Sequence, residues 1–340
     1  MSRASDTSST IGTNERRCII DLLESLEGYA LCPIDERGGS TGPVRYTGTV
    51  VIREVEAKTV VSRVRGLDTF FGLDYGMNLY RGCQHRCIYC DSRSACYRVD
   101  GFDREILVKE NAIELLRKEL ASKRVRGTIG TGSMNDPYMP VERDVNLTGQ
   151  ALSVIAEFRF PVHVMTKSDL VLRDIELLER ISRVYATISF TITCADDELA
   201  KKLEPGAALV SERLQAMKTL ADRGIRTGIT MMPILPFIED DEENVRRIVE
   251  LAAAHGASYI IPWFGMTLRD RQRAYYYARL DELFPGLKEK YERTYGERYA
   301  CTSPNVRRLE TLFDDLCARY GIATRIEPYR EVEATQMELF

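Results

Sequence analysis

Residues 75–90 of the chain read YGMNLYRGCQHRCIYC. The apolar run at residues 75–80 predicts a β-strand. Three cysteines, Cys83, Cys87 and Cys90, follow it directly in the spacing C-x3-C-x2-C. In parallel βα folds the loops that follow the strands build the active site. The stretch therefore predicts the first strand of such a fold, with a cysteine site in the loop at its carboxyl end.

Five further apolar or β-branched runs, each bounded by turn residues, predict strands at residues 127–132, 161–166, 184–191, 225–232 and 257–264. Segments with a helical period separate them at residues 105–123, 170–182, 211–223 and 241–255. Strands alternating with helices predict parallel βα units, and six units are too few for a closed eight-stranded barrel. The expected fold is α/β: an incomplete (β/α)6 TIM-type barrel over residues 46–267 with a helical C-terminal extension over residues 268–330.

The ends of the predicted helices carry capping residues. Ser211 and Asp241 stand where N-caps belong, and Gly224 and Gly256 follow the ends of two helices. Outside the barrel, residues 1–45 contain one candidate helix at 14–29 and a linker-like run, so we expect a partly disordered extension. Residues 331–340 are expected to form a flexible tail.

The three clustered cysteines indicate a metal centre. Three thiolates on one short loop can hold three irons of a [4Fe-4S] cluster, and the fourth iron then lacks a protein ligand and stays open for a cofactor or substrate. The alternative is a structural Cys3His zinc site with His85 as the fourth ligand, in a zinc-stabilised nucleic-acid-binding module without chemistry. His85 lies inside the first cysteine pair, which is a poor spacing for zinc, so we favour the cluster.

The pattern C-x3-C-x-aromatic-C resembles the signature of radical S-adenosylmethionine (SAM) enzymes, with Cys83, Cys87, Tyr89 and Cys90 at the matching positions. The resemblance implies that the cysteines hold a [4Fe-4S] cluster whose open iron binds SAM. It implies an enzyme that cleaves SAM reductively to a 5′-deoxyadenosyl radical. It also implies an external electron donor such as a flavodoxin or a ferredoxin. The protein would supply orientation and exclude water.

Five segments in order resemble more specifically the spore photoproduct lyase branch of DNA repair photolyases, at residues 78–83, 131–138, 166–168, 172–174 and 203–205. By this resemblance, Ser133 or Asp136 contacts the amino group of SAM. Lys167 and Ser189 contact its carboxylate, and Tyr89 lies near the adenine. Nucleic acid is the substrate that the resemblance implies, and a peptide or small metabolite is the alternative.

The chain departs from spore photoproduct lyase at two places. That enzyme uses a cysteine near the end of strand two as hydrogen donor, and residues 127–138 contain none. It also has an aromatic residue directly after the third cluster cysteine, where this chain has Asp91. Either Cys96, Cys194 or a tyrosine takes the donor role, or the reaction differs.

Composition limits the cellular setting and the partners. The 340 residues are 44% hydrophobic and 29% charged, with a formal net charge of −4, so the chain can bury a large core but does not coat nucleic acid non-specifically. The nine cysteines are an odd number, which argues against a disulfide framework. No apolar run is long enough to cross a membrane, and the start lacks the apolar region of a signal peptide. We therefore expect a soluble, cytoplasmic protein.

The last five residues, Gln336-Met337-Glu338-Leu339-Phe340, resemble the motif Gln-Leu-x-Leu-Phe by which bacterial repair and replication proteins dock on the sliding clamp. Leu339 and Phe340 would be apolar anchors, and Gln336 would provide hydrogen bonds. The alternative is a tail whose apolar end folds back onto the domain. If the motif is used, the enzyme works near DNA.

Overall fold

The computed structural model describes residues 45–331 except 48–49, 65, 67 and 69. The predicted helix at 14–29, the N-terminal extension up to residue 44 and the clamp motif with Gln336, Leu339 and Phe340 lie outside the described residues. Within the described part of the chain, none of the helices has both the length and the apolar character needed to cross a membrane.

A seven-stranded sheet forms the centre of the fold, in the order β11-β10-β9-β8-β7-β4-β3. Six strands run parallel: β4 (Tyr75–Met77), β7 (Ile129–Thr131), β8 (Val162–Thr166), β9 (Ala186–Thr191), β10 (Arg226–Met231) and β11 (Tyr259–Pro262). β3 (Val61–Arg63) adds an antiparallel edge. All six predicted strands are confirmed. Because β3 and β11 remain at opposite edges, the barrel is incomplete, as expected.

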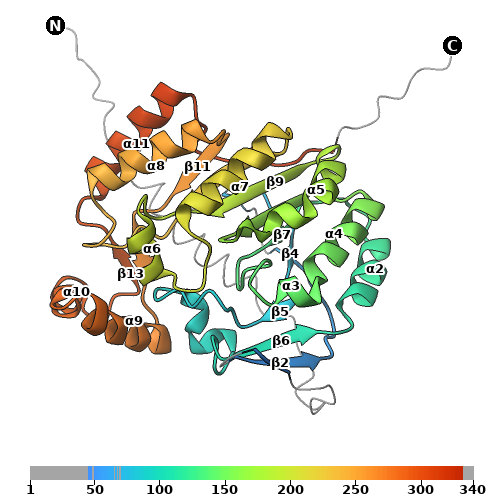
Figure 1. The fold of residues 1–340 in the computed structure, drawn as a ribbon, viewed down its shortest axis with the longest axis horizontal. Helices are drawn as coiled ribbons and strands as arrows, with labels where there is room; N and C mark the ends of the chain where they lie inside the picture. The colour runs from blue at the N-terminus through green and yellow to red at the C-terminus, as the bar shows by residue number, and fades with distance from the viewer. Residues whose placement is uncertain (1–44, 48–49, 65, 67, 69, 332–340) are drawn as a thin grey trace, which may run out of the picture.

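Helices follow these strands and cover the outer face of the sheet (Figure 1). The main ones are α2 (Ala112–Ser122), α4 (Leu147–Phe158), α5 (Ile175–Ser182), α7 (Val210–Asp222) and α8 (Glu242–Ala254). Short elements occupy the loops at the carboxyl ends of the strands: η1 (Asp91–Arg93), η2 (Ala95–Tyr97), α3 (Glu142–Val145), η3 (Asp169–Asp174) and α6 (Asp197–Leu203). The strands are buried on both faces, which accounts for their β-branched, nearly continuous apolar sequence.

Two local predictions were wrong. Residues 105–109 form a strand, β6 (Glu105–Lys109), instead of the first turns of a helix, because Ile106 and Val108 alternate into the core and pair with β2 (Val50–Val55). This strand belongs to a second sheet, β1-β2-β6-β5, with β1 at Arg45–Thr47 and β5 at Tyr80–Arg81. Ser211 is not an N-cap, because α7 already begins at Val210 and the Ser211 hydroxyl donates to Asp197. Asp241 does cap α8, through the amide of Asn244.

Apolar side chains from distant segments fill the open side of the barrel. Val64, Phe71 and Leu73, which follow β3, pack against Tyr259 and Ile261 of β11 and against Ile326 near the end of the described chain. Ala323 extends the sheet by a parallel bridge to Tyr259. The gap left by the missing two βα units is thus sealed by side chains and a C-terminal segment.

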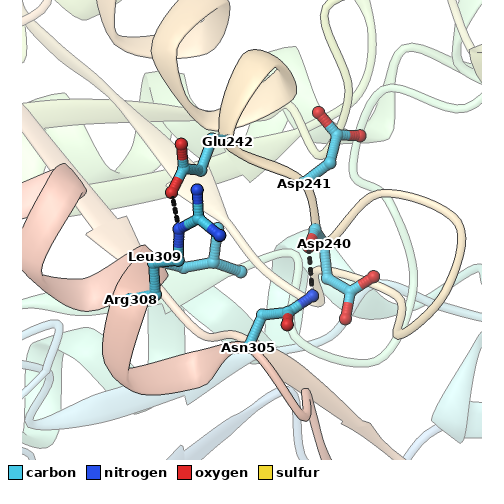
Figure 2. Close-up of a pocket in the computed structure, with 6 residues that line it drawn as sticks. All are labelled: Asp240, Asp241, Glu242, Asn305, Arg308 and Leu309. Carbon is cyan, nitrogen blue, oxygen red and sulfur yellow. Dashed lines mark hydrogen bonds and ion pairs between the residues drawn. The ribbon is translucent and has the colours of Figure 1, made fainter.

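The C-terminal extension contains α9 (Asp270–Leu283), α10 (Leu287–Tyr295) and α11 (Val306–Tyr320), which confirms the helical prediction. It also contains a strand, β13 (Ala300–Thr302), which pairs with β12 (Gly265–Thr267) at the end of the barrel region. Helices α9 and α10 lie beside α6, whereas α11 packs along α8 (Figure 1). Figure 2 shows how α11 is fixed: Asn305 donates to the carbonyl of Asp240, and Arg308 pairs with Glu242.

Candidate functional site

The three cysteines of the predicted cluster lie on the loop after β5 and line one cavity at the carboxyl ends of the strands. Cys83 and Cys87 are buried and Cys90 is half-buried. Burial raises the pKa of the Cys83 thiol to about 12 and also raises the pKa values of Cys87 and Cys90. Metal binding displaces the protons of such thiols, so the loop presents three candidate ligands for metal.

The donor set fits a cluster better than a single zinc ion. Among the described residues, no three His, Cys, Asp or Glu side chains converge closely enough to hold one metal ion. His85, the expected fourth zinc ligand, lines the same cavity, but both ring nitrogens already have contacts: Nδ1 lies 2.9 Å from the carbonyl of Gly206, and Nε2 lies 3.1 Å from Asp136. The three thiols line one cavity, as a cluster bound through three of its irons requires.

The loop after β7 forms the opposite wall of the cavity. It begins at Gly132, where φ is +97° and an added Cβ would lie 2.1 Å from the carbonyl oxygen of Met165. Only glycine fits this close approach to β8. The half-buried Ser133 follows it and lines the cavity. Ser133 is therefore placed where a polar group of a bound ligand can reach it.

Asp136 lines the same cavity, but its carboxylate already has four partners. Oδ1 accepts from the Tyr138 amide (2.8 Å) and the Thr166 hydroxyl (2.7 Å). Oδ2 accepts from the Lys167 amide (2.6 Å) and lies 3.1 Å from His85. Burial alone would raise the pKa of Asp136, but His85 and these donors outweigh it and lower the pKa to about 2. This geometry makes Asp136 a brace between the loop after β7, the end of β8 and the cysteine loop.

Lys167 enters the cavity from the end of β8 and is held by a buried group of charges behind it. Its Nζ lies 4.0 Å from Glu204, which also pairs with Arg213 at 2.6 Å. Burial would raise the pKa of Glu204, but Arg213 and Lys167 reverse the effect and lower it. Lys167 is thus the cationic side chain that lines the cavity, where a ligand carboxylate could pair with it.

Two residues expected at the SAM site do not line this cavity. The Tyr89 hydroxyl donates to Glu204, and its ring is buried beside Leu203 and Tyr276. Ser189 is fully buried in the middle of β9, where its hydroxyl contacts His163 Nε2 at 2.8 Å and the Tyr259 hydroxyl at 2.7 Å. The residue of β9 that does line the cavity is Thr191, two positions further toward the carboxyl end. The two-residue repeat of a strand puts both side chains on one face, so sequence alone did not separate them.

Asp91, where the chain departs from spore photoproduct lyase, joins the cysteine loop to the C-terminal extension. Its carboxylate accepts from the hydroxyls of Thr267 (2.9 Å) and Tyr97 (2.8 Å) and lies 3.3 Å from Arg269. Gln272 of α9 donates to the carbonyl of Tyr89 at 3.0 Å. An aromatic side chain has no carboxylate to bridge Thr267, Tyr97 and Arg269, so this link between the loop and the extension depends on Asp91.

Neither of the two cysteines considered as hydrogen donors lines the cavity. Cys96 is exposed, with Sγ 3.3 Å from Arg269. Cys194 is buried in the main core, beyond the end of β9. Sequence reasoning missed two features of the site: Arg213, and the role of Glu204 as a brace. The segment 203–205 was a signal for Glu204, but nothing distinguished Arg213 from the other charged residues of α7.

Comparisons with known proteins bear on this site. The family model described as the radical SAM superfamily matches residues 77–252, half of the chain. An uncharacterised protein of Methanocaldococcus jannaschii is 35% identical over 173 residues, which are 50% of this chain and 64% of that protein. A radical SAM Nα-GlyT isomerase of Pseudomonas phage M6 is 28% identical over 54% of this chain and 37% of that protein.

The solved structures agree with the fold. Spore photoproduct lyase complexed with dinucleoside spore photoproduct aligns with a TM-score of 0.59 and 16% identity, over 79% of each chain. The incomplete barrel is thus shared with that enzyme. Enzymes of the matched superfamily use a [4Fe-4S] cluster and SAM, and the three cysteines of this chain stand inside the matched segment. The chain belongs to the radical SAM superfamily.

Proposed function

We propose that this enzyme binds SAM between the cysteine loop and Lys167 and abstracts a hydrogen atom from a nucleobase of nucleic acid. One observation carries the proposal: the three ligand cysteines, Ser133 and Lys167 line one cavity. When bound, the cluster supplies the electron that cleaves SAM to methionine and the 5′-deoxyadenosyl radical. The protein's own residues bind and orient the cofactor and keep water out.

In this proposal Lys167 binds the methionine carboxylate, and Glu204 with Arg213 keeps the lysine side chain directed into the cavity. Ser133 accepts a hydrogen bond from the methionine amino group. Asp136 and His85 set the spacing between the loop that carries Ser133 and the cysteine loop. The distances above support the roles of Glu204, Arg213, Asp136 and His85, and the shared cavity supports those of Lys167 and Ser133. Tyr89 and Ser189 act indirectly, by filling and bracing the wall behind the site.

Nucleic acid as substrate is supported by one similarity. The fold is shared with spore photoproduct lyase, which was solved with dinucleoside spore photoproduct. The strand-two cysteine of spore photoproduct lyase is missing here, so dimer reversal through that donor is excluded for this chain. Hydrogen abstraction from a base is the proposed step, with an external flavodoxin or ferredoxin as the electron source.

Anaerobic purification of the Cys87→Ala variant tests the first half of the proposal. The parent should form 5′-deoxyadenosine from SAM under dithionite, and the variant should form none because one iron loses its ligand. Equal formation by both proteins would refute the cluster assignment. For the substrate, we expect ultraviolet-damaged or base-modified DNA to increase SAM cleavage. An increase with peptides or metabolites and none with any DNA would instead favour the alternative substrate class.

A further inference from the structure

A buried cation, Arg93, directly follows the cysteine loop. It is the last residue of the 3-10 turn η1, for which Cys90 is the N-cap, and its amide donates to the Cys90 carbonyl at 3.3 Å. Residues three positions apart in such a turn lie on the same side of it. The local fold therefore places Arg93 beside the third ligand cysteine.

Aromatic rings enclose the guanidinium group of Arg93. It lies 3.7 Å from the ring centre of Tyr275 on α9 and 5.4 Å from that of Phe102. Phe102 packs with Cys83, and Cys90 lies against the same group of apolar side chains. Arg93 is only 8% exposed, so its positive charge acts on its neighbours with little screening by water.

Asp103 is the carboxylate that pairs with Arg93, at 3.1 Å from Nη2. Burial alone would raise the pKa of Asp103, but its bond to Arg93 outweighs burial and lowers the pKa, so both groups are charged. The Asp103 side chain is 21% exposed and the Arg93 side chain 7%. Water therefore screens the carboxylate more than the guanidinium, and the positive member of the pair acts more strongly on buried neighbours.

Two observations direct this charge toward the cysteines. Nε of Arg93 is buried and has no hydrogen-bond partner among the described residues, although buried polar atoms in proteins nearly always have one. Burial raises the pKa of the Cys90 thiol, and Arg93 opposes this rise more strongly than Lys167 does. A free N–H group and a positive charge beside a ligand cysteine suit an anionic iron–sulfur cluster.

We propose that Arg93 sets the reduction potential of the cluster, as a buried positive charge beside the iron that Cys90 binds and as a hydrogen-bond donor to sulfur there. This inference rests on the proposed function, because it requires a cluster on the three cysteines. On reduction the cluster gains one electron from a low-potential one-electron reductant, and no bond forms or breaks. Arg93 stabilises the added negative charge, so the potential is higher with Arg93 than without it.

The test uses the cluster-loaded protein, purified anaerobically and titrated with dithionite in the absence of SAM and substrate, with electron paramagnetic resonance as the readout. Arg93→Gln removes the cation, and Asp103→Asn removes the carboxylate. Both changes break the same ion pair, so a structural role alone moves the potential in one direction or not at all. The charge of Arg93 predicts shifts of opposite sign.

The matched control is Arg226→Gln. Arg226 also lies over a tyrosine ring, that of Tyr259 at 5.9 Å, and 3.9 Å from a carboxylate, that of Glu327. It is the first residue of β10, at the opposite end of the strand from the cysteine cavity. Loss of this arginine should leave the potential of the cluster unchanged.

We expect Arg93→Gln to lower the ratio of reduced to oxidised cluster at a fixed potential about tenfold, which is about 59 mV for a one-electron couple. Asp103→Asn should raise the ratio about threefold, because the cation then lacks its counter-charge. Arg93→Lys keeps the charge and lacks the Nε–H group, so its potential should lie between those of the parent and Arg93→Gln.

Shifts of one sign in both variants, no shift in either, or an equal shift in the control would overturn the role of Arg93 and leave the proposed function standing. If Arg93→Gln holds no cluster, Asp103→Asn decides alone, and a potential that does not rise would overturn the inference. A parent without the signal of a reduced [4Fe-4S] cluster would refute the cluster assignment, and with it both the proposed function and this role of Arg93.

Discussion

Replacement of Gly206 by alanine should damage the metal site without unfolding the protein. The new Cβ would lie 2.1 Å from the Gln84 carbonyl oxygen and 2.9 Å from the His85 Cα. Both atoms belong to the backbone, so no side-chain rotation relieves the contact. The shorter distance falls about 1.3 Å below the 3.4 Å at which ordinary van der Waals contact begins. The cysteine loop and the turn at Gly206 must therefore separate by about 1 Å.

That separation breaks two hydrogen bonds that flank the contact. The Gly206 amide donates to the His85 carbonyl at 2.9 Å, and His85 Nδ1 meets the Gly206 carbonyl at 2.9 Å. Two such bonds contribute about 1–3 kcal/mol together, which a large domain tolerates. A displacement of about 1 Å at a reacting centre, however, can cost about a hundredfold in rate. The effect on catalysis should thus far exceed the effect on stability.

The assay measures iron per chain and 5′-deoxyadenosine formation under dithionite, with urea denaturation as the stability readout. The control is Gly224→Ala, where φ is +75° and nothing lies within 4 Å of the new Cβ. We expect the control to lose stability through backbone strain and to keep its iron and its rate. If Gly206→Ala keeps full iron content and parent activity, then the close packing of this turn does not position the cysteines, and the reasoning is wrong.

Three further predictions concern stability and the tail. Arg213→Met leaves buried Glu204 without its 2.6 Å partner and should lower the free energy of unfolding by about 3–5 kcal/mol in urea titrations; a loss below 1 kcal/mol would contradict a buried ion pair. The pKa of buried Glu239 is raised from 4.5 to about 8, so the folded state keeps a proton that the unfolded state releases, and stability falls as pH rises from about 4.5 to 8. Between pH 5 and pH 8 the unfolding free energy of the Glu239→Gln variant should fall by roughly 4 kcal/mol less than that of the parent. Identical pH profiles of the two proteins would exclude the shift. Deletion of residues 336–340 should abolish capture of the protein by the bacterial sliding clamp with unchanged iron content, and retained capture would reject the motif.

The sequence predicted the parallel sheet because each central strand is buried on both faces. Such strands are rich in β-branched residues. It did not predict β6, because Ile106 together with Ala112, Leu115, Leu116 and Leu120 fits one apolar face of a helix. The helical pattern starts only at Ala112, after the strand has ended. Periodicity cannot separate a five-residue strand from the helix that follows it closely.

At the site, spacing alone located Cys83, Cys87 and Cys90, because the ligands lie on one loop. Lys167 and Ser133 were predicted from the resemblance together with their positions at strand ends. Both line the cavity with the cysteines, and their contacts with SAM stay predictions. The Glu204–Arg213 pair could not be predicted. Arg213 occupies a buried position of an otherwise amphipathic helix, and only the tertiary fold places its guanidinium against the Thr191 carbonyl and Glu204.

The contact between Asp91 and Thr267 bears on how the protein matures. These residues are 176 positions apart, so a ribosome that has just made the cysteines needs on the order of ten seconds or more to make their partner. Throughout that interval the nascent loop lacks the outer support that α9 later gives it. Iron and sulfide delivered during this interval would reach an incompletely supported cysteine loop that is accessible to oxygen and to competing thiols. The cell's assembly machinery is thus expected to load the finished polypeptide after its release, and chains cut short before β12 should accumulate as colourless protein.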